Sequence, residues 1–527
     1  MVAPARRFGH ARCRKRVLFL WFPASLLLFL HSMHTLTRRS AGALAWMVLL
    51  AYFGSPGFAA DHFLVIGGGD GPQNNQVSLE KNVQFFQRVL ADTQGTIAGS
   101  DVLFSDGLAG GRGVQLESPH EVPRLNLLLA RLFDRENGIE LEYRRHQLTG
   151  VRGPATRRGL NEWFNSTGKK LGDGDRLLIY FTGHGGPGQP AQNTTFSMWN
   201  ERPMPVSEFV GYLDRLSPKV EVMLLMVQCH AGGFAGVIFK NGKLNGELSP
   251  ARRIGFFATK SDRNAAGCTP DTREEDYRDY STYFLAALDG KTRTGKPVTG
   301  CDLDGDGRVS FAEAHAYVLI HSDTIDIPTT TSECLLRTYS KTAGEGLAKP
   351  EQPYGEVVEK ASLLDRAVLE GLSGELKLTT ENRYDEAKRL AQLVEAQRKT
   401  TQGNINQKNQ ERDRLNRAIR ARLLQRWPEL SNPWHPRVAK LMADEGSDIQ
   451  RAIDMDSDTP RWEMLYRDAE HLDAHALDLE RKWAKCIRFE RMMQTVALAA
   501  NIEKVANPQV LERYKEMVAQ EAQGLGK

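Results

Sequence analysis

Leu177-Leu178-Ile179-Tyr180-Phe181-Thr182-Gly183-His184-Gly185-Gly186 and Val222-Met223-Leu224-Leu225-Met226-Val227-Gln228-Cys229-His230-Ala231-Gly232-Gly233 are two similar stretches, about 45 residues apart. Each is an apolar run of strand length that ends in one reactive side chain and then small residues. Parallel α/β sheets place their sites at the carboxyl edge. The pattern therefore predicts an imidazole and a thiol at one sheet edge.

An imidazole and a thiol are the minimum set for nucleophilic acyl transfer. A lone Cys at a strand end is more often a small buried hydrophobe, so the pairing with His184 carries the prediction. The glycines beside both residues would let a substrate backbone approach closely. His230 is the rival base, but neighbours in an extended segment point to opposite sides, which favours His184 as the partner of Cys229.

Length and composition bound the remaining possibilities. At 527 residues the chain predicts two or three domains, with an ordinary 41% hydrophobic and 25% charged content. The net charge of +4 comes from six basic side chains among the first sixteen residues. Without them the chain is near neutral, which argues against a nucleic-acid partner.

The first 60 residues predict a targeting region. After Met33, a basic stretch with Arg38 and Arg39 precedes an apolar run over 41–53 and small residues up to Ala60. This is the layout of a cleavable export signal, with Met33 as a possible start and a periplasmic or extracellular mature chain. The alternative is an uncleaved membrane anchor, although the apolar runs fall short of the roughly 20 residues that span a bilayer.

Beyond residue 60 the chain holds five cysteines, an odd number that predicts one free thiol and up to two bridges in an exported protein. Cys229 is expected to be the free one. Cys301 with Cys334 is the first choice of bridge, because both flank one compact insertion.

Strand and helix signals alternate over residues 61–340, which predicts an α/β domain with a mostly parallel, helix-covered sheet. Residues 341–355 read as a linker. From 356 to 527 strand signals vanish, and amphipathic patterns predict an α-helical, coiled-coil-like domain with a polar interruption at 400–410.

Residues 302–313 fit a twelve-residue EF-hand loop. A hard cation wants six or seven oxygen ligands, and Gly307 at position 6 allows the sharp turn. No entering helix is evident before the loop, so we expect a structural Ca²⁺ rather than a sensor. The ligands would be Asp302, Asp304, Asp306, the Arg308 carbonyl, Ser310 and Glu313.

The segment Tyr180-Phe181-Thr182-Gly183-His184-Gly185 and the Cys229 strand resemble the caspase-like (clan CD) cysteine peptidases, and most of all the legumain family. The similarity covers roughly residues 61–320. It implies that Cys229 is the nucleophile and His184 the proton donor to the leaving amine, with the Gly185 and Cys229 amides as oxyanion hole. It places Asp70 where the family has an Asn that orients the His, and Ser261 and Asp279 in the substrate-binding region.

Departures from the family bear on specificity. Val227 stands where an acidic residue is expected, and the serines expected before Cys268 are replaced by Asn264, Ala265 and Ala266. Asp279 alone resembles the acidic group of the S1 pocket, so Asn/Asp or a basic residue at P1 both remain open.

The leading hypothesis is an exported cysteine endopeptidase of protein or peptide substrates. Its rivals are a catalytically inactive caspase-like scaffold and a membrane-anchored, transamidase-like factor. The C-terminal helices are a candidate docking surface for a protein partner, with a legumain-like pro-domain as the alternative.

Overall fold

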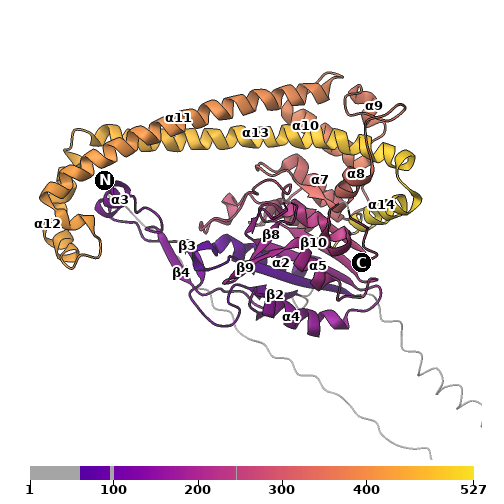
Figure 1. The fold of residues 1–527 in the computed structure, drawn as a ribbon, viewed down its shortest axis with the longest axis horizontal. Helices are drawn as coiled ribbons and strands as arrows, with labels where there is room; N and C mark the ends of the chain where they lie inside the picture. Colours follow the sequence, from indigo (N-terminus) through magenta and orange to yellow (C-terminus); the bar gives the residue numbers. More distant parts are fainter. Residues whose placement is uncertain (1–59, 95–99, 191, 245, 527) are drawn as a thin grey trace, which may run out of the picture. The chain divides into compact units, whose positions relative to one another are not determined.

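The computed structural model describes residues 60–94, 100–190, 192–244 and 246–526, and the predicted targeting region lies outside them. A seven-stranded sheet of order β12-β11-β10-β6-β1-β2-β5 runs through the α/β part (Figure 1). All its pairs are parallel except β11 with β12. The strands are β1 (Asp61–Gly68), β2 (Ser100–Phe104), β5 (Val151–Gly153), β6 (Arg176–Gly183), β10 (Glu221–Met226), β11 (Arg253–Phe257) and β12 (Thr329–Thr330).

The central strands form where the sequence is continuously apolar. β6 lies between β1 and β10, and its residues from Leu177 onward are buried. A strand covered on both faces has no solvent side that would require alternating polar residues. The predicted mostly parallel sheet flanked by helices is confirmed.

Helices and small sheets surround this sheet. α2 packs against α6, and α6 against α7, while α4 packs against α5. The helices are α2 (Val77–Gln94), α4 (Arg157–Ser166), α5 (Val206–Leu213), α6 (Tyr280–Asp289), α7 (Phe311–His321) and α8 (Thr331–Tyr339). Short 3₁₀ helices are η1 (Pro72–Asn74), η2 (Gly168–Lys170), η3 (Ala231–Ile238), η4 (Lys240–Gly242), η5 (Glu274–Asp276) and η6 (Pro428–Ser431). The two small sheets are β3 (Val114–Glu117) with β4 (Leu141–Arg144), and β7 (Gly185–Gly186) with β8 (Thr195–Met198) and β9 (Glu201–Pro205).

The C-terminal region is helical, as expected. It comprises α9 (Tyr354–Val358), α10 (Leu363–Leu376), α11 (Arg383–Arg426), α12 (Val438–Asp454), α13 (Thr459–Val505) and α14 (Pro508–Glu521). α11 and α13 lie side by side as a long pair, here called the helical arm, with α12 at one end (Figure 1). The expected polar interruption at 400–410 is wrong, because α11 continues through it with Thr401 and Ile405 buried.

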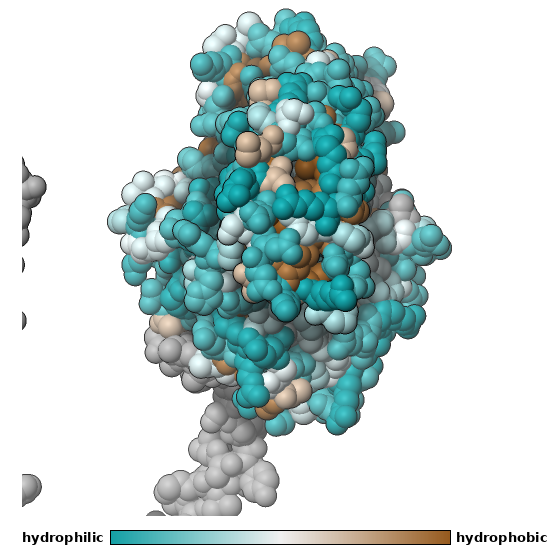
Figure 2. All heavy atoms as spheres, turned by 90° about the vertical axis from the view of Figure 1, so that its left-hand side faces the viewer, coloured by the Kyte–Doolittle hydropathy of each residue, from teal (hydrophilic) through white to brown (hydrophobic). Residues whose placement is uncertain are grey.

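A helix from the α/β part, α3 (Arg124–Leu132), docks on the α12 end of the arm. Its Leu125, Leu128 and Leu132 share one apolar cluster with side chains of α11, α12 and α13. Seen from that end, the surface is mostly hydrophilic, and hydrophobic atoms show mainly in hollows (Figure 2). The arm is therefore packed at both ends rather than free at one.

The predicted boundary at 341–355 does not separate two compact units, because residues 59–527 form one unit. Leu498, Ile502, Val510 and Met517 belong to the same core cluster as the central strands. The helices thus complete the α/β core, which an amphipathic pattern alone does not reveal.

The cysteines also differ from expectation. All five in the described residues are free, so the predicted Cys301–Cys334 bridge is absent from the structure. Among the described residues, no helix is long and apolar enough to cross a bilayer.

Candidate functional site

Strand register brings His184 and Cys229 to the same edge of the sheet. β6 and β10 pair in parallel with Phe181 opposite Met226, and each reactive residue follows three positions later. The backbone of Gly185 lies so close to the Cys229 loop that a Cβ on Gly185 would collide with the carbonyl oxygen of Cys229. The loops after β6 and β10 are therefore in direct contact, as the two strand motifs predicted.

The thiol of Cys229 is half-buried and held by a neighbouring loop. The amide of Ala265 donates a hydrogen bond to its Sγ at 3.3 Å. Burial raises the pKa of Cys229; the Ala265 amide opposes this rise, and the negative charge of Asp326 adds to it. The resting thiol is therefore protonated at neutral pH and needs a base before it can attack.

The imidazole of His184 is held by the turn after β1. Its Nε2 lies 2.8 Å from the carbonyl oxygen of Asn74 and 3.0 Å from Oε1 of Gln76. With two acceptors as partners, Nε2 carries the proton and Nδ1 is left with its lone pair. The neutral ring therefore has the tautomer of a base that acts through Nδ1.

Asn74 and Gln76 were not foreseen from the sequence. Their segment is held by β3, since the Gln115 amide donates to the Asn75 carbonyl at 2.9 Å. A Cβ at Gly69 would overlap the Asn74 backbone, so the Gly-rich turn serves close packing. The signal in the sequence was that glycine run, which carries no hint of the long-range partner.

Asp70 does not take the place predicted for it. Its carboxylate accepts a hydrogen bond from Asn74 Nδ2 at 2.8 Å, so it steadies the residue whose carbonyl meets His184. The prediction of direct orientation by Asp70 is corrected to an indirect one.

The amides of Gly185 and Cys229 are the oxyanion donors that the resemblance implies. His184 and Ser197 form a hydrogen-bonded pair, since the Ser197 amide donates to the His184 carbonyl at 2.9 Å. Antiparallel pairs alternate, so Gly185 opposite Phe196 directs its N–H away from β8. Among the described residues the Cys229 amide has no backbone carbonyl partner from another residue. Both donors thus belong to the loops that carry the thiol and the imidazole.

His230 has a structural role. It is left-handed, with φ of 60°, and its Nδ1 lies 2.7 Å from the carbonyl oxygen of Ser261. The His230 amide also donates to the Arg263 carbonyl at 2.7 Å. Ser261 therefore lies beside the Cys229 loop, and its carbonyl anchors that loop; the substrate-binding role that the resemblance implies for Ser261 stays a prediction.

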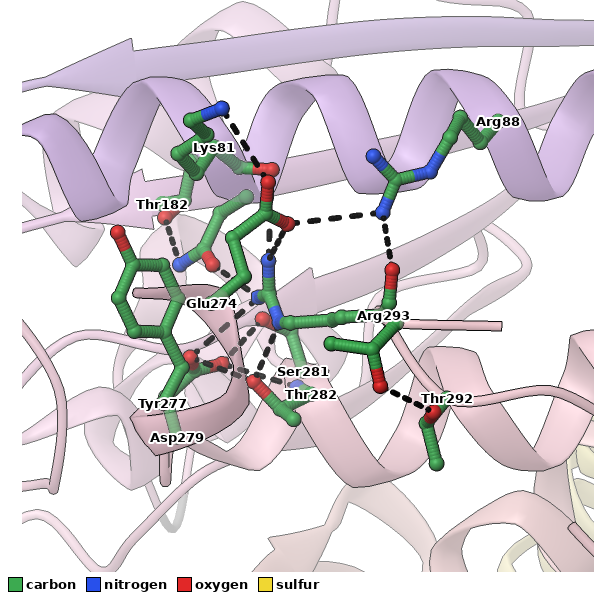
Figure 3. A network of polar contacts seen from close by, with 12 residues as sticks. Lys81, Arg88, Thr182, Glu274, Tyr277, Asp279, Ser281, Thr282, Thr292 and Arg293 are labelled. Atoms are coloured by element: carbon green, nitrogen blue, oxygen red, sulfur yellow. Dashed lines mark hydrogen bonds and ion pairs between the residues drawn. The ribbon is translucent and has the colours of Figure 1, made fainter. Parts of the chain in front are cut away.

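Asp279 lies in a buried polar network rather than in an open acidic pocket (Figure 3). It caps the N-terminus of α6, accepting from the Thr282 amide at 3.0 Å and the Thr282 hydroxyl at 2.8 Å. Arg293 Nη2 stands 3.5 Å from its Oδ2 and is itself buried. The carboxylate is neutralised from within the fold, which corrects its predicted place as the charge that meets a substrate.

The 302–313 loop gathers three carboxylates. One oxygen each of Asp302, Asp304 and Asp306 lies within 4.8 Å of the others, and all three residues are exposed. Glu313 is buried and accepts from the Leu303 amide at 2.7 Å and the Ser310 amide at 2.8 Å. It also completes the capping box of α7 with Ser310. The three aspartates could together hold a hard cation, although they and Glu313 all accept backbone hydrogen bonds within the loop.

No protein-family model and no curated protein sequence matches this chain. Among solved structures, it is similar to the crystal structure of protein GSU0716 from Geobacter sulfurreducens, with 11% sequence identity and a TM-score of 0.30. That match covers 51% of this chain and 92% of the other.

Proposed function

We propose that the protein is a cysteine endopeptidase in which Cys229 and His184 carry out acyl transfer. The observation that carries the proposal is the shared register of β6 and β10, which puts the thiol and the imidazole on touching loops. His184, whose Nε2 is held by Asn74, and the amides of Gly185 and Cys229 would supply the further parts that such chemistry needs.

In the proposed reaction, His184 Nδ1 takes the thiol proton as Sγ attacks the scissile carbonyl carbon. The oxyanion is met by the Gly185 and Cys229 amides. His184 then gives its proton to the leaving amine, which departs and leaves a thioester. Water, activated by the same imidazole, hydrolyses the thioester and frees Cys229. An amine in place of water would give the transamidase-like outcome.

For P1, the fold supports an uncharged or acidic residue over a basic one. The Asp279 carboxylate is buried beside Arg293, so its attraction for a cationic side chain is largely cancelled. The test is a peptide-library cleavage profile with the Asp279→Asn variant as control. Preferential cleavage after Arg or Lys would refute this specificity.

The test of the activity compares Cys229→Ala and His184→Ala with the unchanged protein. Cys229→Ala should abolish both cleavage and labelling by an electrophilic peptide probe, and His184→Ala should slow cleavage at least about a hundredfold. His230→Ala is the comparison: it should slow cleavage less than His184→Ala does, because its ring anchors the Cys229 loop through Ser261 and takes no proton from the thiol. An unchanged protein that neither cleaves nor labels would favour the inactive scaffold.

Calcium is proposed as a structural ligand of the 302–313 loop. The three aspartates would hold it, and the bound charge would offset the repulsion among them. Export also remains a proposal, based on residues 33–60, with membrane contact only if that segment is uncleaved. A protein partner on the helical arm is likewise a proposal.

A further inference from the structure

One buried arginine of the helical arm hydrogen-bonds to the backbone of the α/β part. Arg488 of α13 donates to the carbonyl oxygens of Ser322 at 3.0 Å, Thr324 at 3.1 Å and Asp326 at 2.8 Å. It is only 2% exposed, and burial lowers its pKa to about 10. One guanidinium thus holds the backbone between α7 and β12 in a single shape.

Asp326 stands at the end of that segment and has no exposed surface. Its Oδ1 accepts a hydrogen bond from the Ala266 amide at 2.7 Å. Its Oδ2 is buried and has no hydrogen-bond partner among the described residues. Such a carboxylate is costly to bury, and burial raises its pKa to about 7. Burying Asp326 here therefore costs stability.

The residue that donates to Asp326 is adjacent in the chain to the residue that donates to the thiol. Ala266 follows Ala265, whose amide holds the Sγ of Cys229 at 3.3 Å. The charge on Asp326 also acts on the thiol, where it opposes formation of the thiolate. A continuous set of contacts therefore leads from Arg488 through Asp326 and the Ala265–Ala266 backbone to Cys229.

A second contact brings α13 to the same loop. Arg263 forms an ion pair with Glu480 at 2.8 Å and lies over the Trp483 ring at 4.6 Å. The loop over residues 261–266 is here called the thiol loop. It contacts α13 directly through Arg263, and indirectly through Asp326, which bonds both Arg488 and the Ala266 amide. Arg488, Glu480 and Trp483 all belong to α13, so of these contacts the α/β part alone keeps only the bond between Asp326 and the Ala266 amide.

We propose that Arg488 and Asp326 are positioning residues for Cys229, so that the helical arm is part of the catalytic machinery. This rests on the proposed peptidase function for its role in turnover. Its effect on the thiol itself is independent of any substrate. The arm thereby sets both where the sulfur lies and how readily it ionises.

The test measures Cys229 reactivity in the full chain. The rate of iodoacetamide alkylation is followed against pH, and the slower background of the other thiols is subtracted with Cys229→Ala. Asp326→Asn keeps an oxygen for the Ala266 amide and removes the charge, so the alkylation midpoint should move to lower pH. Asp326→Ala loses the acceptor, so kcat should fall at least about tenfold with KM within twofold.

Arg488→Met should lower kcat as Asp326→Ala does. Arg461→Met is the control on the same helix, because the exposed Arg461 pairs with Glu411, at 2.8 Å, and its loss should leave alkylation and turnover unchanged. If Arg488→Met is insoluble, the isosteric Asp326→Asn decides. An alkylation profile of Asp326→Asn identical to that of the unchanged protein would overturn the positioning proposal.

The two proposals fail in different ways. If Asp326→Asn shifts the alkylation midpoint but the protein cleaves no peptide, the positioning proposal stands and the peptidase proposal is refuted. If the protein cleaves peptides at the same rate with and without the Asp326 and Arg488 substitutions, the peptidase proposal stands and the positioning proposal is refuted.

Discussion

Met517→Ala tests whether the C-terminal helix α14 completes the α/β core. Met517 has no exposed surface and belongs to the core cluster that contains the central strands. Truncating a buried Met to Ala costs about 2 to 5 kcal/mol, from lost burial and the cavity left behind. Val518, its neighbour, is 43% exposed, so Val518→Ala should change stability by less than about 0.5 kcal/mol.

The assay is urea unfolding followed by tryptophan fluorescence and far-UV circular dichroism. We expect Met517→Ala to unfold at a clearly lower urea concentration than the unchanged protein. Val518→Ala should unfold at the same urea concentration as the unchanged protein. If both variants unfold at the same urea concentration as the unchanged protein, the side chain of Met517 contributes nothing to the core, and our account of α14 is wrong.

A chain that ends at Val505 extends the same test. It would lose the burial of Val510 and Met517, each worth roughly 1.5 to 3 kcal/mol. It would also lose the hydrogen bond from Arg513 to the Ala251 carbonyl, at 2.6 Å. The sum is a large part of the ~5 to 15 kcal/mol that stabilises a domain, so we expect an insoluble or partly unfolded product. A truncated protein with unchanged unfolding would refute this.

Three further predictions follow from single sites. Gly185→Ala should lower kcat/KM at least about a hundredfold, because the added Cβ would collide with the Cys229 carbonyl. Gly186→Ala should have a small effect, because the nearest atom to its Cβ is 3.4 Å away, and equal losses in the two variants would contradict the contact. Calcium should raise the melting temperature relative to chelator by binding the folded state, and Asp304→Asn should reduce the shift; equal melting temperatures with and without calcium would leave the loop without its ion. Burial raises the pKa of Glu521 to about 7, so the folded state holds a proton that the unfolded chain has released, and the free energy of unfolding falls as pH rises from about 4 to 7. Glu521→Gln should therefore be neutral at pH 5 and stabilising at pH 8, and a stabilisation independent of pH would refute the assignment.

The sequence was informative wherever structure follows from local pattern. Unbroken apolar runs predicted β6 and β10, and the parallel arrangement then placed His184 and Cys229 at one edge. The pairing needed no knowledge of distant partners, because strand ends in a parallel sheet share an edge. The same local reasoning identified the aspartates of the 302–313 loop.

It failed where a side chain's role depends on a distant residue. Asp279 has the charge of a substrate-binding acid, but Arg293 and the start of α6 use that charge inside the fold. The resemblance places Asp70 beside His184, yet the carbonyl of Asn74 meets the imidazole because β3 holds that turn. Composition shows which groups are present, and only tertiary packing shows which are already satisfied.

The helical arm is the clearest case. Its charged sequence indicated a separate domain, because a long helix buries only a narrow stripe and exposes the rest. The stripe nevertheless includes Arg488, about 160 residues from the backbone that it holds and more than 250 from Cys229. A buried guanidinium that bonds backbone carbonyls cannot be released without leaving those carbonyls unpaired, which costs about 1 to 3 kcal/mol for each group. Arg488 therefore ties α13 to the segment that precedes β12, and the Arg263–Glu480 ion pair ties α13 to the thiol loop. If the positioning proposal is correct, a change that displaced α13 would also displace Cys229.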